Sequence, residues 1–146
     1  MLNAYTAPHG QRQCGRYMAE SSIEWTDFTF NGWIGCTRIS PGCDNCYAAA
    51  QDKFRGWTPE GWGAGKPRRR TSEANWRQPL RWNASAASTG TRRRVFCSSL
   101  ADVFDNEAPD EWRADLADLI FCTPNLDWQL LTKRIGNASR MLHAMF

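Results

Sequence analysis

Histidine is nearly absent from this sequence. Only two of the 146 residues are histidine, and both, His9 and His143, lie near the ends of the chain. A Ser-His-Asp arrangement needs a histidine beside its nucleophile, so the sequence argues against hydrolase chemistry of that kind. It also contains no internal repeat and no glycine-rich phosphate loop.

Long apolar runs are absent as well. No segment approaches the roughly 18 apolar residues that a membrane helix requires, so we expect no membrane association. The first twenty residues include Arg12, Arg16 and Glu20 and have no apolar core, which argues against a signal peptide. Six cysteines could form a disulfide framework in a small secreted protein. Without a sign of secretion we expect a cytoplasmic protein, where metal binding outranks disulfide formation.

The chain is also too short for a complete eight-unit (βα) barrel. Its 146 residues suggest a single domain, but an eight-unit (βα) barrel needs on the order of 200 residues or more. We therefore expect a partial barrel that a partner chain completes, or the N-terminal part of a longer protein. The second is preferred because Met145 and Phe146 fall within what looks like an unfinished helix. The expected organisation is a loose lead-in over 1–21 and a three-cysteine βα domain over 22–146.

Three cysteines occur close together with the spacing C-x6-C-x2-C. They are Cys36, Cys43 and Cys46, and the longer gap contains Ser-Pro-Gly, which favours a sharp turn. Such a turn can bring all three thiols to one side of a small concavity. Three thiolates favour an iron–sulfur cubane with one open iron; the alternatives are a structural zinc and a role as small buried residues. Candidate fourth ligands are His9, Cys14, Cys97 and Cys122.

Alternating strand and helix patterns predict an α/β fold. Aromatic residues alternate with polar ones over 24–34, which indicates an extended segment, and Asp27 and Asn31 within it could cap or line a site. Compact runs at 95–100 and 127–134 indicate two further strands. Helices are expected from Tyr47 to near Gly56, from Pro109, and from Asn137, with loops over 56–65 and 83–90. Together these segments predict about three βα units forming a parallel, partial barrel-like sheet.

The helix that opens at Pro109 has the clearest pattern of the three. Its apolar residues recur at i, i+4, i+7 and i+8 and form one stripe, made of Trp112, Leu116, Leu119 and Ile120. We expect its charged residues, among them Arg113, to cover the outer side. Pro109 suits the first turn of a helix, and the acidic residues after it suit the positive end.

Charge is distributed unevenly along the chain. The net charge of +3 is too small to identify a partner, but nine basic residues and one acidic residue fall between Lys66 and Arg94. This region is either a solvated surface or a phosphate-contacting patch in which Trp76 and Trp82 stack on bases. In the second case nucleic acid would bind through Arg68, Arg69, Arg70, Arg77 and Arg81. At the C-terminal end of the third expected strand, Lys133 and Arg134 could pair with a carboxylate or phosphate.

Several motifs resemble one family of phage proteins. They are the run from Ser22 to Asp27, Asn31, Gly35-Cys36, the run from Ser40 to Cys43, and Cys46-Tyr47-Ala48. Later blocks of the chain match the pattern of the same family and occur in the family's order. They are residues 79–82, 95–96, 99–104 and 129–134. The chain thereby resembles the uncharacterised three-cysteine family described as phage gene product thirty-seven/sixty-eight, which is similar to radical S-adenosylmethionine enzymes.

This resemblance implies a cofactor and a location for it. In radical S-adenosylmethionine enzymes three cysteines ligate a [4Fe–4S] cluster, and S-adenosylmethionine binds the open iron. The implied cluster ligands are Cys36, Cys43 and Cys46. Ser98 and Ser99 lie at the C-terminal end of the second expected strand and Asp102 just past it, at the edge where such enzymes contact the amino-acid part of the bound methionine.

The sequence therefore leads to one preferred function and two alternatives. The preferred function is a radical-enzyme-like iron–sulfur protein that acts on a nucleic acid or nucleotide. The first alternative is a zinc-stabilised nucleic-acid-binding module without catalysis. The second is a truncated inactive fragment with exposed strand edges.

Overall fold

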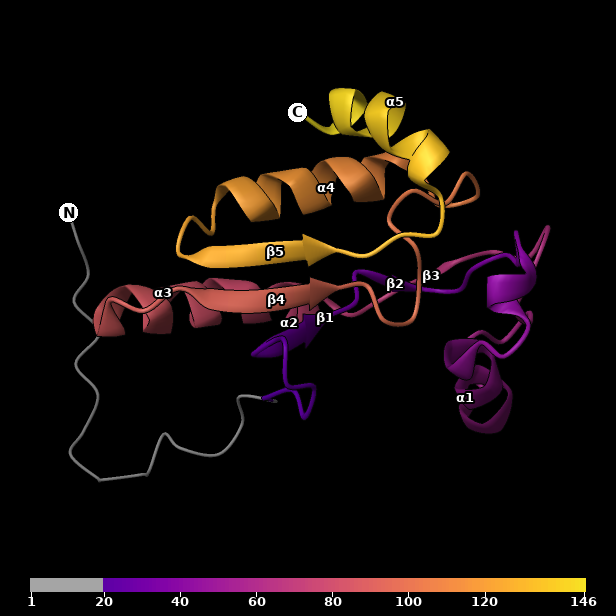
Figure 1. The fold of residues 1–146 in the computed structure, drawn as a ribbon, viewed down its shortest axis with the longest axis horizontal. Coiled ribbons are helices and arrows are strands. Elements are labelled where there is room, and N and C mark those ends of the chain that lie inside the picture. The colour runs from indigo at the N-terminus through magenta and orange to yellow at the C-terminus, as the bar shows by residue number, and fades with distance from the viewer. Residues whose placement is uncertain (1–19) are drawn as a thin grey trace.

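The computed structural model describes residues 20–146, and Figure 1 shows its arrangement. The expected lead-in over 1–21 lies almost wholly outside these residues, as do His9 and Cys14. The elements in chain order are β1 (Phe28–Phe30), β2 (Trp33–Ile34), the 3₁₀ helix η1 (Pro41–Cys43), α1 (Tyr47–Arg55), β3 (Arg69–Arg70), α2 (Glu73–Trp76), α3 (Gln78–Thr89), β4 (Arg93–Cys97), α4 (Asp110–Phe121), β5 (Leu126–Leu130) and α5 (Ile135–Met145). None of the described helices is long and apolar enough to span a bilayer.

The main sheet has three parallel strands in the order β1-β4-β5. Phe30 pairs with Cys97, and Cys97 pairs in turn with Leu130, so all three carboxyl ends reach the same edge. Helix α3 lies in the connection from β1 to β4, and α4 lies in the connection from β4 to β5. The predicted α/β fold with parallel βα units is confirmed, and the sheet is open rather than closed into a barrel.

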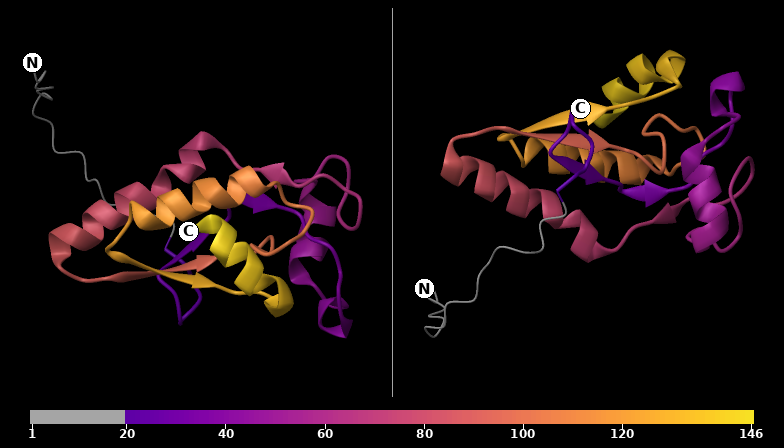
Figure 2. Two further views of the ribbon diagram at one scale, coloured as in Figure 1. Left: turned by 90° about the horizontal axis from the view of Figure 1, so that it is seen from above. Right: turned by 60° about the horizontal axis from the view of Figure 1, so that its bottom comes forward.

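The core lies between this sheet and the helices that connect its strands. Figure 2 shows α3 and α4 side by side along one face of β4 and β5. Phe28 of β1 stacks on Trp82 of α3 with ring centroids 4.5 Å apart, and Leu116 of α4 is completely buried in the same cluster. Because aromatic pairs and apolar burial dominate core energetics, this face is what holds the sheet to its helices.

The predicted loop over 83–90 is wrong, because residues 83–89 belong to α3 and Gly90 caps its end. Small and polar side chains alone favour a loop, but Trp82 and Ala86 lie four residues apart on one helical face and are both buried. The hydroxyl groups of Ser88 and Thr89 donate hydrogen bonds to the carbonyl of Ser85. Tertiary burial of one face therefore outweighs the weak local preference, and the helix ends at Gly90 in the left-handed conformation.

The extended segment over 24–34 divides into two strands. The chain leaves the main sheet after β1, and β2 pairs antiparallel with β3 in a small second sheet. Gly32 lies between the two strands, where a Cβ atom would be 2.8 Å from the ring of Trp76. The indole of Trp76 also donates a hydrogen bond to the Gly32 carbonyl. This close approach of backbone to a ring directs the chain toward Cys36.

Helix α4 confirms the predicted apolar stripe but not the predicted outer face. Leu116 and Leu119 are buried as expected, whereas Arg113 is only 4% exposed instead of covering the solvent side. Its guanidinium donates hydrogen bonds to the carbonyls of Asp105 and Ala108. Arg113 therefore ties α4 to the loop that follows β4, because buried cations need such partners.

Candidate functional site

A cavity of about 210 Å3 opens at the carboxyl edge of the parallel sheet. Its walls come from the cysteine loop (residues 36–46), the start of α1, the loop after β4 and the loop after β5. The structure brings all eight predicted site residues to this cavity: Cys36, Cys43, Cys46, Ser98, Ser99, Asp102, Lys133 and Arg134. Segments that are up to 98 residues apart in the chain thus meet in one place.

The cysteine loop turns as its Ser-Pro-Gly sequence predicts. Residues Pro41–Cys43 form η1, closed by a hydrogen bond of 2.9 Å from the Cys43 amide to the Ser40 carbonyl. Cys46 is the residue before the first turn of α1, which runs from Tyr47 to Arg55. The free amides of that helix end favour nearby negative charge, such as that of thiolates.

The three cysteines all line the cavity. Among residues 20–146, no group of three or more His, Cys, Asp and Glu side chains is placed to hold a single metal ion. A zinc ion gathers four ligands at one atom, whereas a cubane takes each thiolate on a different iron and so accepts wider spacing. Cys36, Cys43 and Cys46 supply the type of donor that either a cluster or a zinc ion binds.

The other described cysteines are poorly placed as a fourth ligand. Cys97 is completely buried in the core, and this burial raises its pKa to about 12. Cys122 is exposed and follows α4, near the edge of the sheet where β5 begins. Since site residues collect at the opposite edge, Cys122 lies away from the cavity.

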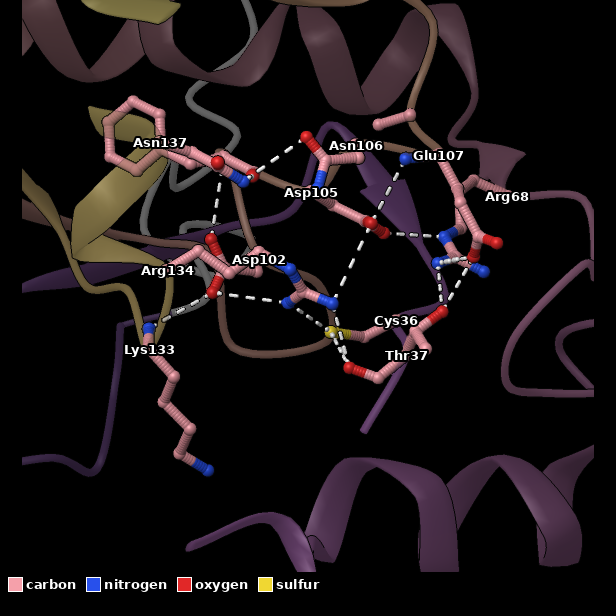
Figure 3. A network of polar contacts seen from close by, with 12 residues as sticks. Cys36, Thr37, Arg68, Asp102, Asp105, Asn106, Glu107, Lys133, Arg134 and Asn137 are labelled. Carbon is pink, nitrogen blue, oxygen red and sulfur yellow. Dashed lines mark hydrogen bonds and ion pairs between the residues drawn. The ribbon is translucent and has the colours of Figure 1, made fainter. Parts of the chain in front are cut away.

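Cys36 is the cavity cysteine that a buried arginine contacts. Nη1 of Arg134 donates to Cys36 Sγ at 3.2 Å, and Nη2 donates to the Thr37 carbonyl at 2.7 Å. The Arg134 side chain is only 6% exposed and lies 3.5 Å from Asp102 and 3.7 Å from Asp105. Figure 3 shows the guanidinium between these carboxylates and the sulfur. Burial raises the pKa of Cys36, and the hydrogen bond from Arg134 partly opposes that effect.

A second buried arginine holds the loops behind Cys36, as Figure 3 also shows. Arg68 Nε donates to Asp105 Oδ2 at 2.6 Å, and both side chains are 1% exposed. Its Nη2 bonds Thr37 Oγ1 at 2.6 Å and Glu107 Oε2 at 2.5 Å. Hydrogen bonds from Thr37 and the Gly65 amide, together with the charge of Arg68, lower the pKa of Glu107. This network fixes the segment that carries Cys36.

The predicted nucleic-acid patch is therefore partly wrong. Arg68 is committed to internal ion pairs, so it cannot contact a phosphate. The guanidinium of Arg70 lies 4.0 Å from the ring of Trp76 and pairs with Asp115 at 2.7 Å. Trp76 and Trp82 are both buried and thus not free to stack on bases. Arg69, Arg77 and Arg81 are exposed as predicted.

Asp102 organises the loop after β5. Its two carboxylate oxygens accept hydrogen bonds from the Thr132 hydroxyl at 2.8 Å and the Lys133 amide at 3.0 Å. Lys133 then extends to the Gly42 carbonyl, 3.0 Å from its Nζ. Backbone hydrogen bonding at Ile39 lowers the pKa of Cys43, and the charge of Lys133 adds to this. Asp102 thus fixes Thr132 and Lys133, which form one wall of the cavity.

Asn31 holds the loop after β4 in place through two hydrogen bonds. Its side chain donates to Ser99 Oγ at 2.9 Å and accepts from the Leu100 amide at 2.8 Å. On the other side of the cavity, the Tyr47 hydroxyl donates to the Ser99 carbonyl at 3.0 Å. Asp27 does not share this location, because it accepts from the Arg94 amide at the amino edge of the sheet. The expectation that Asp27 lines the site is wrong.

Several lining residues were not identified from the sequence. Tyr47, Trp62, Phe96 and Leu131 give the cavity much of its apolar surface. Trp62 lies in the glycine-rich loop over 56–65, where no periodicity indicates its direction. The partnership of Arg68 with Glu107 was also missed, because it joins residues 39 positions apart that share no motif.

Fold and site together define an open α/β protein with a three-cysteine cavity at the carboxyl edge of its parallel sheet. By its sequence the chain belongs to the family described as Protein of unknown function (DUF5131), whose model matches residues 20–146. Comparisons with curated proteins and with solved structures give no match. The resemblance to the phage family and to radical S-adenosylmethionine enzymes stays a prediction.

Proposed function

We propose that this protein binds a [4Fe–4S] cluster through Cys36, Cys43 and Cys46 and S-adenosylmethionine in the same cavity, as a radical-enzyme-like protein. The observation that carries this proposal is the meeting of all three thiols and the five predicted cofactor-binding residues around one cavity. All five cysteines among residues 20–146 are free thiols, which supports function in a reducing compartment such as the cytoplasm.

The residues of the cavity have properties that suit these two groups. The amino end of α1 and the cations Lys133 and Arg134 favour an anionic, thiolate-ligated cluster. Hydroxyl groups of Ser98 and Ser99 could bind the polar end of a small ligand, and the apolar lining excludes water. A bound cubane with an open iron supplies one-electron reduction of S-adenosylmethionine, while the protein supplies binding and orientation.

Anaerobic reconstitution with iron and sulfide tests the metal assignment. We expect about four irons and about four sulfides per chain in the unaltered protein. Cys36→Ser, Cys43→Ser and Cys46→Ser should each lose most of the iron, because each removes one thiolate. Cys122→Ser is the matched control, since it removes an exposed thiol that lies outside the cavity.

Two outcomes would replace this proposal. One tightly held zinc and no iron would favour the zinc-stabilised binding module instead. A protein that aggregates without retaining any metal would favour a truncated inactive fragment. Iron that persists in all three cavity variants would show that the thiols of the cavity are not its ligands.

A nucleic-acid or nucleotide substrate is a second, separate proposal. Arg77 and Arg81 are exposed, and no ion pair within residues 20–146 engages either one. Free cations of this kind contact phosphates, and the affinity then falls as salt rises. Arg77→Ala with Arg81→Ala should weaken binding of a single-stranded oligonucleotide and reduce its salt dependence. Arg38→Ala, which removes an arginine already paired with Asp44, is the control.

A further inference from the structure

The three cavity cysteines are not equivalent in their surroundings. Cys36 accepts a hydrogen bond from a guanidinium that is almost completely buried, and the same guanidinium holds the next carbonyl, that of Thr37. Cys43 and Cys46 lie on a loop whose neighbouring residues are exposed. One of the three positions is therefore bonded to a buried cation, whereas the other two belong to a more exposed segment.

The contacts of Arg134 are directed toward the cysteine segment. Its shortest polar contacts with other segments, 2.7 and 3.2 Å, go to Thr37 and Cys36. Its contacts with Asp102 and Asp105 are longer, at 3.5 and 3.7 Å. Asp105 has a closer cation in Arg68, at 2.6 Å. Neutralising Asp105 is thus mainly the role of Arg68, and Arg134 is left to act on the sulfur.

The charges behind Cys36 are nearly balanced but slightly negative. Two arginines, Arg68 and Arg134, face three carboxylates, those of Asp102, Asp105 and Glu107. Without Arg134, two mostly buried carboxylates would lie behind Cys36 with one fewer cation between them and the sulfur. Water screens such charges poorly, because Asp102 and Asp105 are 8% and 1% exposed at their side chains.

We propose that Arg134 raises the reduction potential of the cluster bound through Cys36, by donating a charged hydrogen bond to that ligand sulfur. This inference rests on the proposed function. Reduction adds one negative charge to the cluster, and a positive hydrogen-bond donor at a ligand sulfur stabilises the more negative state. Arg134 is therefore a positioning residue that acts through Cys36.

Lys133 provides a contrast within the same cavity. It also carries a positive charge and lines the cavity, but it is exposed and its Nζ bonds the Gly42 carbonyl. Solvent screens an exposed charge more strongly than a buried one. Removing Lys133 should therefore change the potential less than removing Arg134, although both changes remove one positive charge.

A redox titration of the full chain, reconstituted anaerobically, tests this inference. The midpoint potential is followed by visible absorbance with mediator dyes. We expect Arg134→Met to shift the potential to a more negative value, Arg134→Lys to shift it less, and Lys133→Met to shift it less than Arg134→Met. Asp105→Asn removes a buried negative charge and should shift the potential in the opposite direction. Arg140→Met, on the exposed side of α5, should leave it unchanged.

The outcomes separate this inference from the proposed function. An unaltered protein that takes up no cluster contradicts the proposed function and the inference together. A cluster whose potential is the same in Arg134→Met as in the unaltered protein contradicts the inference alone. Should Arg134→Met fail to fold, Arg134→Lys decides, because it keeps the charge but loses the paired hydrogen bonds to Cys36 and Thr37. A potential equal to or more positive than the unaltered value would then contradict the inference.

Discussion

Arg68 is expected to be the most stability-critical charged residue near the site. Arg68→Met removes the cation from Asp105, whose side chain is 1% exposed, and from Glu107. Breaking a buried ion pair by removing one partner costs about 3–5 kcal/mol, because the remaining charge stays buried without compensation. Arg68 also donates to the carbonyls of Gly63 and Lys66, so its loss frees those backbone groups as well.

The matched comparison is Arg38→Met. Arg38 and Asp44 form an ion pair whose side chains are 65% and 48% exposed. Exposed pairs contribute about 0–1 kcal/mol, so this variant should lie near the unaltered protein. Urea denaturation followed by tryptophan fluorescence measures both variants, and Arg68→Lys gives a milder change if Arg68→Met does not fold. Equal free energies of unfolding for Arg68→Met and Arg38→Met would refute this assignment of energy to burial.

Three further predictions address the pH dependence, the thiols and the core. The pKa of Glu107 is lowered in the folded chain, so its stabilisation is present above the unfolded pKa of about 4.3 and is lost as the pH falls through the folded value. The difference in melting temperature between the unaltered protein and Glu107→Gln should therefore narrow from pH 7 to pH 3; a constant difference contradicts this. Cys97, buried with a pKa of about 12, should resist iodoacetamide in the metal-free folded protein while exposed Cys122 reacts, as mass spectrometry can show. Trp82→Ala should cost about 3–5 kcal/mol, whereas Phe121→Ala, at an 83% exposed position, should cost less than about 0.5 kcal/mol in urea denaturation; similar costs would contradict the assigned core.

The location of the site could be predicted because it depends on topology rather than on packing detail. Parallel strands bring their carboxyl ends to one edge, so Ser98, Asp102 and Lys133 could be expected to meet once the strands before them were recognised. The turn before Cys43 could also be predicted from the sequence, because proline and glycine constrain the backbone locally. These features arise from short-range chemistry and a general rule of connection.

The elements that were missed depend on distant partners. Whether 83–90 forms a helix is decided by the burial of Ala86 against the sheet, which local preferences do not report. Arg68 and Arg113 look like surface residues in the sequence, and only their carboxylate and carbonyl partners, far along the chain or across a loop, make burial possible. The contact between Arg134 and Cys36 spans 98 positions and has no sequence signal.

The electron spin resonance spectrum of the reduced, reconstituted protein, with and without S-adenosylmethionine, tests the central claim most directly. A cubane held by Cys36, Cys43 and Cys46 leaves one iron open, so we expect a cluster signal that changes when S-adenosylmethionine is added. A signal that S-adenosylmethionine leaves unaltered would contradict binding of the cofactor at that iron. A protein that shows no cluster signal and holds zinc would contradict the iron–sulfur assignment itself.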